Sequence, residues 1–203
     1  MKGKIKKIYI RVKTTTVRNI VTQSIFGTTT PNYKLIHHPL LPNYLKTFNH
    51  KLANNALPVQ AKFKLNVPDL NPYCFLSKTT YENDIHLFSK CVEIKALLHY
   101  VTRIYYNITK QHSTYFHQTI RIKSQTPPQN IPYDEHITPY LNSIMSHTIW
   151  KTRNKNKKQS APNIPAALIK SFKQSLKLRF KIYQTRDRKP YIKVLTQINN
   201  AIF

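Results

Sequence analysis

The chain has 203 residues, of which 33 are Lys or Arg and only seven are Asp or Glu, so its formal net charge at pH 7 is +26. A surplus of this size repels itself and calls for a polyanionic partner, of which nucleic acid is the usual one and an anionic membrane surface the second. No run approaches the roughly 18 apolar residues of a transmembrane helix, whereas 56 residues are Leu, Ile, Val or Phe, enough to build a folded core.

The choice of residues points to an A/T-rich genome. Phe, Tyr, Met, Ile, Asn and Lys, which have A/T-rich codons, number 88, whereas Gly, Ala, Arg and Pro number 31, and Lys outnumbers Arg 25 to 8. Phosphate binding alone would not favour Lys over Arg in this way. The first 13 residues are basic but lack the apolar segment of a signal peptide. An organelle or an A/T-rich microbe would be the natural source of such a genome. Synthesis inside an organelle would explain both observations, so we predict a mitochondrial, organelle-encoded protein of the matrix.

The first 124 residues predict alternating strands and helices. Two-residue alternation of apolar and polar side chains indicates half-buried strands, and a spacing of three to four residues indicates helices. A Thr-rich segment at about 14–40 has neither period and is expected to be an inserted loop. In chain order the predicted elements are a strand at 4–13, a helix opening at Pro42 and Asn43, strands at 61–67 and 85–94, a helix at 95–108 and a strand at 119–123.

This order predicts an α+β fold of the split βαβ, ferredoxin-like type (βαββαβ), with two helices on one face of a single sheet. The polar alternates of three predicted strands are cations, and no acid is interleaved among them. An ordinary solvated face usually mixes charges of both signs, so an RNA-facing sheet surface is the favoured interpretation. The six cations are Arg11, Lys13, Lys62, Lys64, Arg121 and Lys123.

Residues 125–203 predict a basic, partly helical C-terminal extension. Residues 125–165 hold six of the thirteen prolines and are expected to form an extended linker. A helix is predicted at 165–183, and a weaker one follows Pro190. The first helix has an apolar and a basic stripe, so it could dock on RNA and protein, which is favoured, or lie on a membrane. The cations of the linker and this helix are Lys151, Arg153, Lys155, Lys157, Lys158, Lys170, Lys173, Lys177 and Lys181.

Catalysis is argued against by what the chain lacks. Two glycines cannot make a phosphate-cradling loop. The seven acids are thinly spread, and the one adjacent pair, Asp134–Glu135, lies in a Pro-rich segment, whereas a two-metal nuclease needs clustered carboxylates. The nearest groupings among the nine histidines are His37–His38 and His112 with His117. We therefore predict no enzyme activity and no small-molecule substrate.

Cofactor and metal sites are not expected either. None of the histidine spacings matches a known ligand frame, and two cysteines alone make neither a disulfide scaffold nor a zinc site. Cys74 and Cys91 are the only cysteines. Because Cys91 lies in a predicted strand, it is expected to be a small buried apolar residue rather than a redox-active one.

Residues 1–124 resemble the tenth small-subunit ribosomal protein family (S-ten) in a divergent organellar form. The resemblance lies in the opening strand Lys7–Lys13, Leu57-Pro58 before the basic strand Ala61–Leu65, the Val67-Pro68-Asp69 break, the strand ending Cys91–Ile94, the helix at 95–108 and the closing strand at 119–123. It implies a non-catalytic protein of the small-subunit head with the split βαβ fold. It also implies that residues 66–84 form a long loop reaching into rRNA and neighbouring proteins, with Lys62, Lys64 and Lys78 as contacts.

The predicted function is that of a structural constituent of the mitochondrial ribosome, a small-subunit protein in translation that binds ribosomal RNA and neighbouring ribosomal proteins. Two alternatives remain open. One is an organellar maturase or nuclease that depends on Asp134 and Glu135, and the other is a basic peripheral subunit of a membrane complex.

Overall fold

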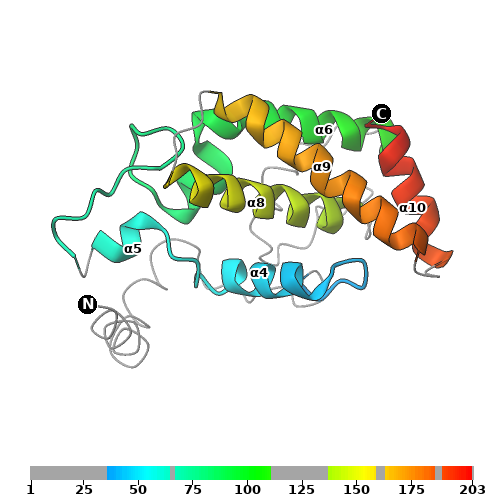
Figure 1. Ribbon diagram of the computed structural model, residues 1–203, viewed down its shortest axis with the longest axis horizontal. Helices are drawn as coiled ribbons and strands as arrows, with labels where there is room; N and C mark the ends of the chain where they lie inside the picture. Colours follow the sequence, from blue (N-terminus) through cyan, green and yellow to red (C-terminus); the bar gives the residue numbers. More distant parts are fainter. Residues whose placement is uncertain (1–35, 65–66, 111–136, 159–162, 186–188, 203) are drawn as a thin grey trace.

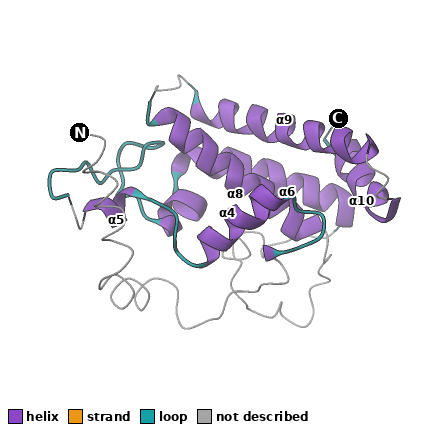
Figure 2. Ribbon diagram, turned by 60° about the horizontal axis from the view of Figure 1, so that its bottom comes forward, coloured by secondary structure: helices purple, strands orange, loops and turns teal. Residues whose placement is uncertain are grey.

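The computed structural model describes residues 36–64, 67–110, 137–158, 163–185 and 189–202. Of these residues, 71% are helical and none belongs to a sheet. The nearest approach to a strand pair among them is an isolated antiparallel bridge between Tyr73 and Tyr81. Figure 2 accordingly shows only helices and loops in the described part. The predicted α+β split βαβ fold is therefore wrong, and the described chain is an α-helical bundle.

The helices are short near the start of the described chain and long towards its end. They are α4 (Asn43–Ala53), α5 (Gln60–Lys64), the π-helix η1 (His86–Lys90), the 3-10 helix η2 (Val92–Ile94), α6 (Lys95–Thr109), α8 (Ile137–Asn156), α9 (Ile164–Thr185) and α10 (Lys189–Asn200).

Helix α8 lies at the centre of the bundle and contacts α4, α6 and α9. Figure 1 shows α4 on one side of α8 and α9 crossing it on the other, with α6 and α10 completing the packing around α9. One continuous apolar core joins these helices. The predicted boundary at residue 124 lies outside the described residues, but helices from both sides of it contribute to this core.

Four predicted helices are confirmed. Helix α4 begins after Pro42, whose extended backbone precedes the first turn. It ends at Asn54, whose backbone N–H donates to the His50 carbonyl at 3.1 Å, and the following Asn55 takes the left-handed conformation (φ 53°) that often closes a helix. The predictions for α6, α9 and α10 agree with the structure to within a few residues at each end.

Two predicted strands are wrong. Residues 60–64 form α5, and the segment 85–94 forms η1 and η2 instead of a strand at 85–94. His86, Leu87 and Phe88 are buried in succession, whereas a strand would turn every second side chain to the opposite face. Val92, an apolar residue that the predicted strand would bury on the same face as Phe88 and Ile94, is 56% exposed. The strands predicted at 4–13 and 119–123 and most of the loop at 14–40 lie outside the described residues.

The extended linker predicted at 125–165 is also wrong where the structure describes it. Residues 137–156 form α8, and fifteen of its twenty residues are buried. Two of its buried hydroxyl groups bond within the helix: Ser143 Oγ donates to the Pro139 carbonyl at 2.6 Å and Thr148 Oγ1 to the Ile144 carbonyl at 2.8 Å. Asn49 of α4 donates to Ser143 Oγ at 2.8 Å and ties the two helices together.

Candidate nucleic-acid interface

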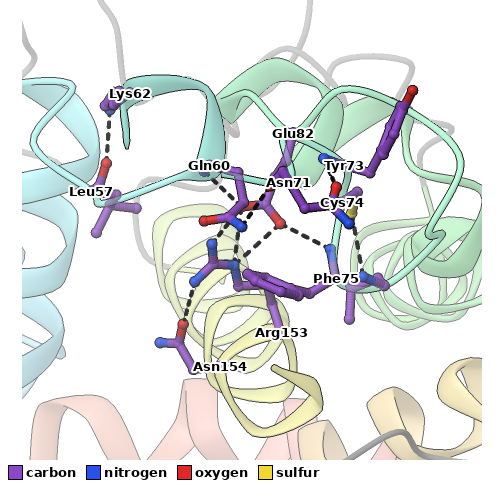
Figure 3. Close-up of polar contacts among 11 residues, drawn as sticks. Leu57, Gln60, Lys62, Asn71, Tyr73, Cys74, Phe75, Glu82, Arg153 and Asn154 are labelled. Carbon is purple, nitrogen blue, oxygen red and sulfur yellow. Dashed lines mark hydrogen bonds and ion pairs between the residues drawn. The ribbon is translucent and has the colours of Figure 1, made fainter. Parts of the chain in front are cut away.

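Arg153, predicted to bind RNA, is an internal residue. It is 3% exposed and its guanidinium faces the fully buried carboxylate of Glu82, with Nε at 3.1 and 3.2 Å from the two carboxylate oxygens. The backbone N–H groups of Gln60 and Phe75 also donate to this carboxylate, at 3.0 and 3.1 Å. Figure 3 shows Glu82 at the centre of these bonds. The pair joins the loop before η1 to α8, so the prediction for Arg153 is corrected to a structural role.

Lys62 and Lys64 are likewise held by contacts within the chain. Lys62 Nζ lies 3.0 Å from Asp84 Oδ2 and also donates to the carbonyls of Asn55 and Leu57, at 2.7 and 2.8 Å. Burial lowers the pKa of Lys62 and raises that of Asp84, outweighing their mutual attraction in both cases. Lys64 Nζ donates to the Pro68 carbonyl. Because no sheet exists here, these two lysines do not form the predicted cationic sheet face.

The other predicted cations fall into three sets. Arg11, Lys13, Arg121 and Lys123 lie outside the described residues. Lys78 is exposed on the loop before η1. The exposed cations of α8 and its final turn are Lys151, Lys155, Lys157 and Lys158, and those of α9 are Lys170, Lys177 and Lys181, with Lys173 half-buried.

Cations of α9 lie on different sides of that helix. Lys173 lies over the ring of Tyr100 in α6, with Nζ at 5.2 Å from the ring centroid. Arg179, on the same helix, lies over the ring of Tyr44 in α4, with Cζ at 5.0 Å. Lys151 of α8 lines the same cleft as Arg179, whereas Lys173 does not. This division argues against one continuous RNA-binding surface made of all predicted cations.

A cleft of 520 Å³ opens between α4, α8 and α9 on the Arg179 side. We call it the basic cleft. Its charged lining consists of Lys46, Lys151 and Arg179, and none of its lining residues, all in the described part of the chain, is acidic. On α8, Lys155 follows Lys151 by four residues, so the two share a helical face beside the cleft wall, and Lys158 lies in the turn after the helix.

Arg179 is 6% exposed but lines this open cleft, and its Nε has no hydrogen-bond acceptor among the described residues. Burial lowers its pKa to about 10, which still leaves it charged at neutral pH, with the nearby Tyr183 opposing the shift. No described carboxylate pairs with it. A buried guanidinium without such a partner is costly, because burial removes the water that would otherwise solvate the charge. An anion entering the cleft would supply the missing acceptor.

Aromatic rings lie beside the cations of the cleft. Tyr44 is 51% exposed, and its ring centroid lies 5.3 Å from that of His147. Burial, with a smaller contribution from Lys151, lowers the pKa of His147 below its ordinary value, so the imidazole is neutral at pH 7. Cations beside a partly exposed ring suit a strand of RNA, since phosphates pair with the cations and unpaired bases stack on the ring.

Sequence reasoning missed Tyr44, Lys46, His147 and Arg179. A signal for Arg179 was present: it lies three residues after Leu176 and four before Tyr183, which places a cation on the buried stripe of α9. The other three gave no signal, because only the packing of α4 against α8 brings them together.

The described residues contain one group that could hold a metal ion. Cys74, His86 and Cys91 are all buried, and their ligand atoms lie within 4.8 Å of one another. Their spacing of twelve and five residues matches no familiar ligand frame, so sequence reasoning missed this group too. Of the histidine groupings that the sequence suggested, His37 is exposed and His38 is buried, whereas His112 and His117 lie outside the described residues, as do Asp134 and Glu135.

Comparisons of the chain with protein families, with curated proteins and with solved structures find no match. In the described part of the chain, no helix combines the length and the hydropathy needed to cross a bilayer.

Proposed function

We propose that this protein is a non-catalytic, RNA-binding structural component of an organellar ribonucleoprotein, with the mitochondrial small ribosomal subunit as the first particle to test. The observation that carries the proposal is Arg179, a buried guanidinium that lines an open cleft and whose Nε has no hydrogen-bond acceptor among the described residues. The net charge of +26 supports it, because neutralising a surplus of this size requires a polyanion. With the split βαβ fold overturned, the proposal no longer depends on the family resemblance.

Phosphate is the favoured ligand chemistry because the cleft offers three cations and no carboxylate. The two buried acids, Glu82 and Asp84, already pair with Arg153 and Lys62 inside the described chain. They therefore neutralise internal cations and leave those of the cleft to an external anion. Each phosphate contact would release a counterion, so binding should weaken steeply with salt.

The cleft is tested by measuring the binding of single-stranded RNA to the full chain by fluorescence anisotropy across a salt series. Lys46→Ala should weaken binding and flatten the slope of log K against log salt by about 0.7, the value of one contact on a single strand. Lys51→Ala is the matched control, because Lys51 lies on the same helix, is exposed and does not line the cleft. Equal effects of the two substitutions would refute the cleft as the RNA site.

Assembly is tested by sedimentation of an organelle lysate. The protein should migrate with the small subunit and move to light fractions after RNase treatment. Persistence in a membrane fraction whatever the RNase treatment would favour the peripheral membrane subunit instead. Magnesium-dependent RNA cleavage that is lost on changing Asp134 and Glu135 would favour the nuclease.

One observation argues against the alternative in which the apolar stripe of α9 lies on a membrane. Leu168, Phe172 and Leu176, on the apolar stripe of α9, are buried inside the bundle. Helix α9 packs through this side on α6, α8 and α10. The stripe is therefore already covered by the chain itself and does not offer a surface to lipid.

A further inference from the structure

We propose that Cys74, His86 and Cys91 form a zinc site that cross-links the segment between α5 and α6. This site is separate from the basic cleft, and none of its residues lines that cleft. Thiolate and imidazole are the ligands that zinc prefers in structural sites. The three side chains are 1%, 7% and 0% exposed, so they form an interior cluster and not a chance surface grouping.

The backbone holds the three ligands in place by two tight local structures. Cys91 N–H donates to the His86 carbonyl at 2.7 Å, closing the π-turn of η1 and placing these two ligands at its ends. Lys78 N–H donates to the Cys74 carbonyl at 2.8 Å, and Lys78 takes a left-handed backbone conformation (φ 64°) that is uncommon outside glycine. Isolated π-turns and left-handed non-glycine residues are both concentrated at functional sites.

The distances are close to those of a zinc centre. Zinc–sulfur bonds of about 2.3 Å and zinc–nitrogen bonds of about 2.0 Å at tetrahedral angles place ligand atoms roughly 3.5–3.8 Å apart. The ligand atoms of the cluster all lie within 4.8 Å of one another, so a contraction of at most about 1.3 Å completes the geometry. Ser77 Oγ lies 3.3 Å from His86 Nε2. The fourth position would thus fall to this hydroxyl or to a water molecule.

One sulfur already accepts a hydrogen bond from the backbone. The Leu76 N–H lies 3.4 Å from Cys74 Sγ. Zinc binds cysteine as the thiolate, so a metal ion entering the site would displace the protons of the two thiols.

Charge balance favours a divalent ion over a monovalent one. Two thiolates and a neutral imidazole carry a charge of −2, so Zn²⁺ gives a neutral centre, whereas Cu⁺ would leave a buried negative charge. Isolated buried charge is expensive. Arg153 is already paired with Glu82. It therefore offers no positive charge to balance the net negative charge that a Cu⁺ centre would carry.

The segment that the metal would fasten has little regular structure of its own. Between α5 and α6 the described chain holds only the bridge from Tyr73 to Tyr81 and the short helices η1 and η2. Zinc binding at three points of this segment would stabilise the fold by mass action, because the site exists only in the folded chain. The site is therefore assigned a structural role.

The test is zinc uptake by the full, reduced chain, measured by elemental analysis after dialysis and by competition with a chromophoric chelator. One zinc ion per chain is expected, with a rise in the thermal midpoint that a chelator reverses. Cys91→Ser should weaken zinc binding by about 100-fold or more, since a ligand is worth at least as much as the outer-shell residues around it. His99→Gln, an exposed histidine outside the cluster, is the matched control and should bind zinc as the unchanged chain does.

Cobalt substitution in the unchanged chain covers the case in which Cys91→Ser fails to fold. Tetrahedral Co²⁺ bound by the two sulfurs should show intense thiolate-to-cobalt charge-transfer absorption. Absence of that absorption in the folded, reduced chain, or zinc uptake that survives Cys91→Ser undiminished, would overturn the proposal.

Discussion

Arg153 shows that part of the basic composition serves the interior of the protein. Its guanidinium lies between the Glu82 carboxylate and the rings of Phe75 and Trp150, with Cζ at 4.7 and 5.0 Å from the two ring centroids. Arg153→Met should lower the free energy of unfolding by about 3–5 kcal/mol, because it leaves a buried carboxylate without its cation. Urea denaturation followed by circular dichroism measures the loss.

Two further variants separate charge from packing at this pair. Replacing both partners, Arg153→Met with Glu82→Gln, should restore a good part of the loss, since no uncompensated charge then remains. Lys155→Met, an exposed neighbour on the same helix, should change the stability by no more than about 0.5 kcal/mol. A loss in the double variant as large as in Arg153→Met would show that the carboxylate charge is not the cause.

His147 gives the protein a predictable response to acid. It packs against Tyr44 and Phe48 of α4, with Lys151 on its own helix and Arg179 lining the same cleft. Burial lowers its pKa below the ordinary 6.5. At a pH between the lowered pKa of the folded chain and the ordinary pKa of the unfolded chain, the unfolded chain binds more protons than the folded one. His147 therefore reduces the stability as the pH falls below about 6.5.

The corresponding prediction is that His147→Gln makes the stability less sensitive to acid. Urea denaturation at about pH 7.5 and about pH 5.5 should show a smaller loss in this variant than in the unchanged chain. His99→Gln, which removes an exposed histidine, should leave the loss unaltered. An identical acid loss in all three proteins would contradict the assignment to His147.

At the scale of whole elements, the helices that could be predicted are those with one apolar and one polar face. Helices α4, α6, α9 and α10 each bury one side and expose the other, so apolar residues recur every three to four positions. The segments at 61–67 and 85–94 are too short to separate the strand period from the helical one. At 86–88 the structure buries three successive side chains, His86, Leu87 and Phe88, which a half-buried strand cannot do.

Helix α8 could not be predicted from its period, because it is buried on nearly all sides. A helix that is covered on most sides has little exposed face and therefore no clear stripe. The prolines of this segment, Pro139 among them, and the basic run at 151–158 suggested a linker. In the structure, Pro139 lies in the first turn of α8, where no intrahelical donor is needed.

The basic cleft was only partly predictable, because it depends on how helices distant in the sequence pack together. Lys151, Lys155 and Lys158 follow from the charge run, and the structure leaves all three exposed. The cleft itself requires α4 to pack beside α8 and α9, which no local pattern encodes. The zinc ligands pose the same difficulty, because a turn and a π-helix bring Cys74 next to Cys91.

Helix α9 offers a test of whether its apolar stripe serves the protein or a partner. Phe172 is fully buried and meets the ring of Tyr100 edge-on at 6.3 Å. Phe172→Ala should lower the free energy of unfolding by about 3–5 kcal/mol, the usual cost of a large cavity. Leu178→Ala, at a position 61% exposed on the same helix, should cost no more than about 0.5 kcal/mol. Similar, small costs for both would mean that the stripe is free to bind a partner.

For the whole molecule, the net charge of +26 acts in opposite directions on folding and on binding. Cations repel one another in the isolated chain, and this repulsion opposes the compact state. The two internal ion pairs of the described residues are buried or nearly so and are little affected by ions in the solvent. Most of the surplus is therefore open to screening by salt and to neutralisation by RNA.

These opposite effects lead to a prediction that can be checked on one preparation of the full chain. Without RNA, the free energy of unfolding should rise between about 50 and 200 mM salt, because screening weakens the repulsion between cations. With saturating RNA at about 50 mM salt, the thermal midpoint should exceed that of the free chain, since binding stabilises the folded state. This advantage should shrink towards about 200 mM salt as counterion release becomes less favourable. Two different monovalent salts control for ion-specific effects. Stability that falls with salt in the absence of RNA would mean that the cations are neutralised within the chain, and the need for a polyanionic partner would then disappear.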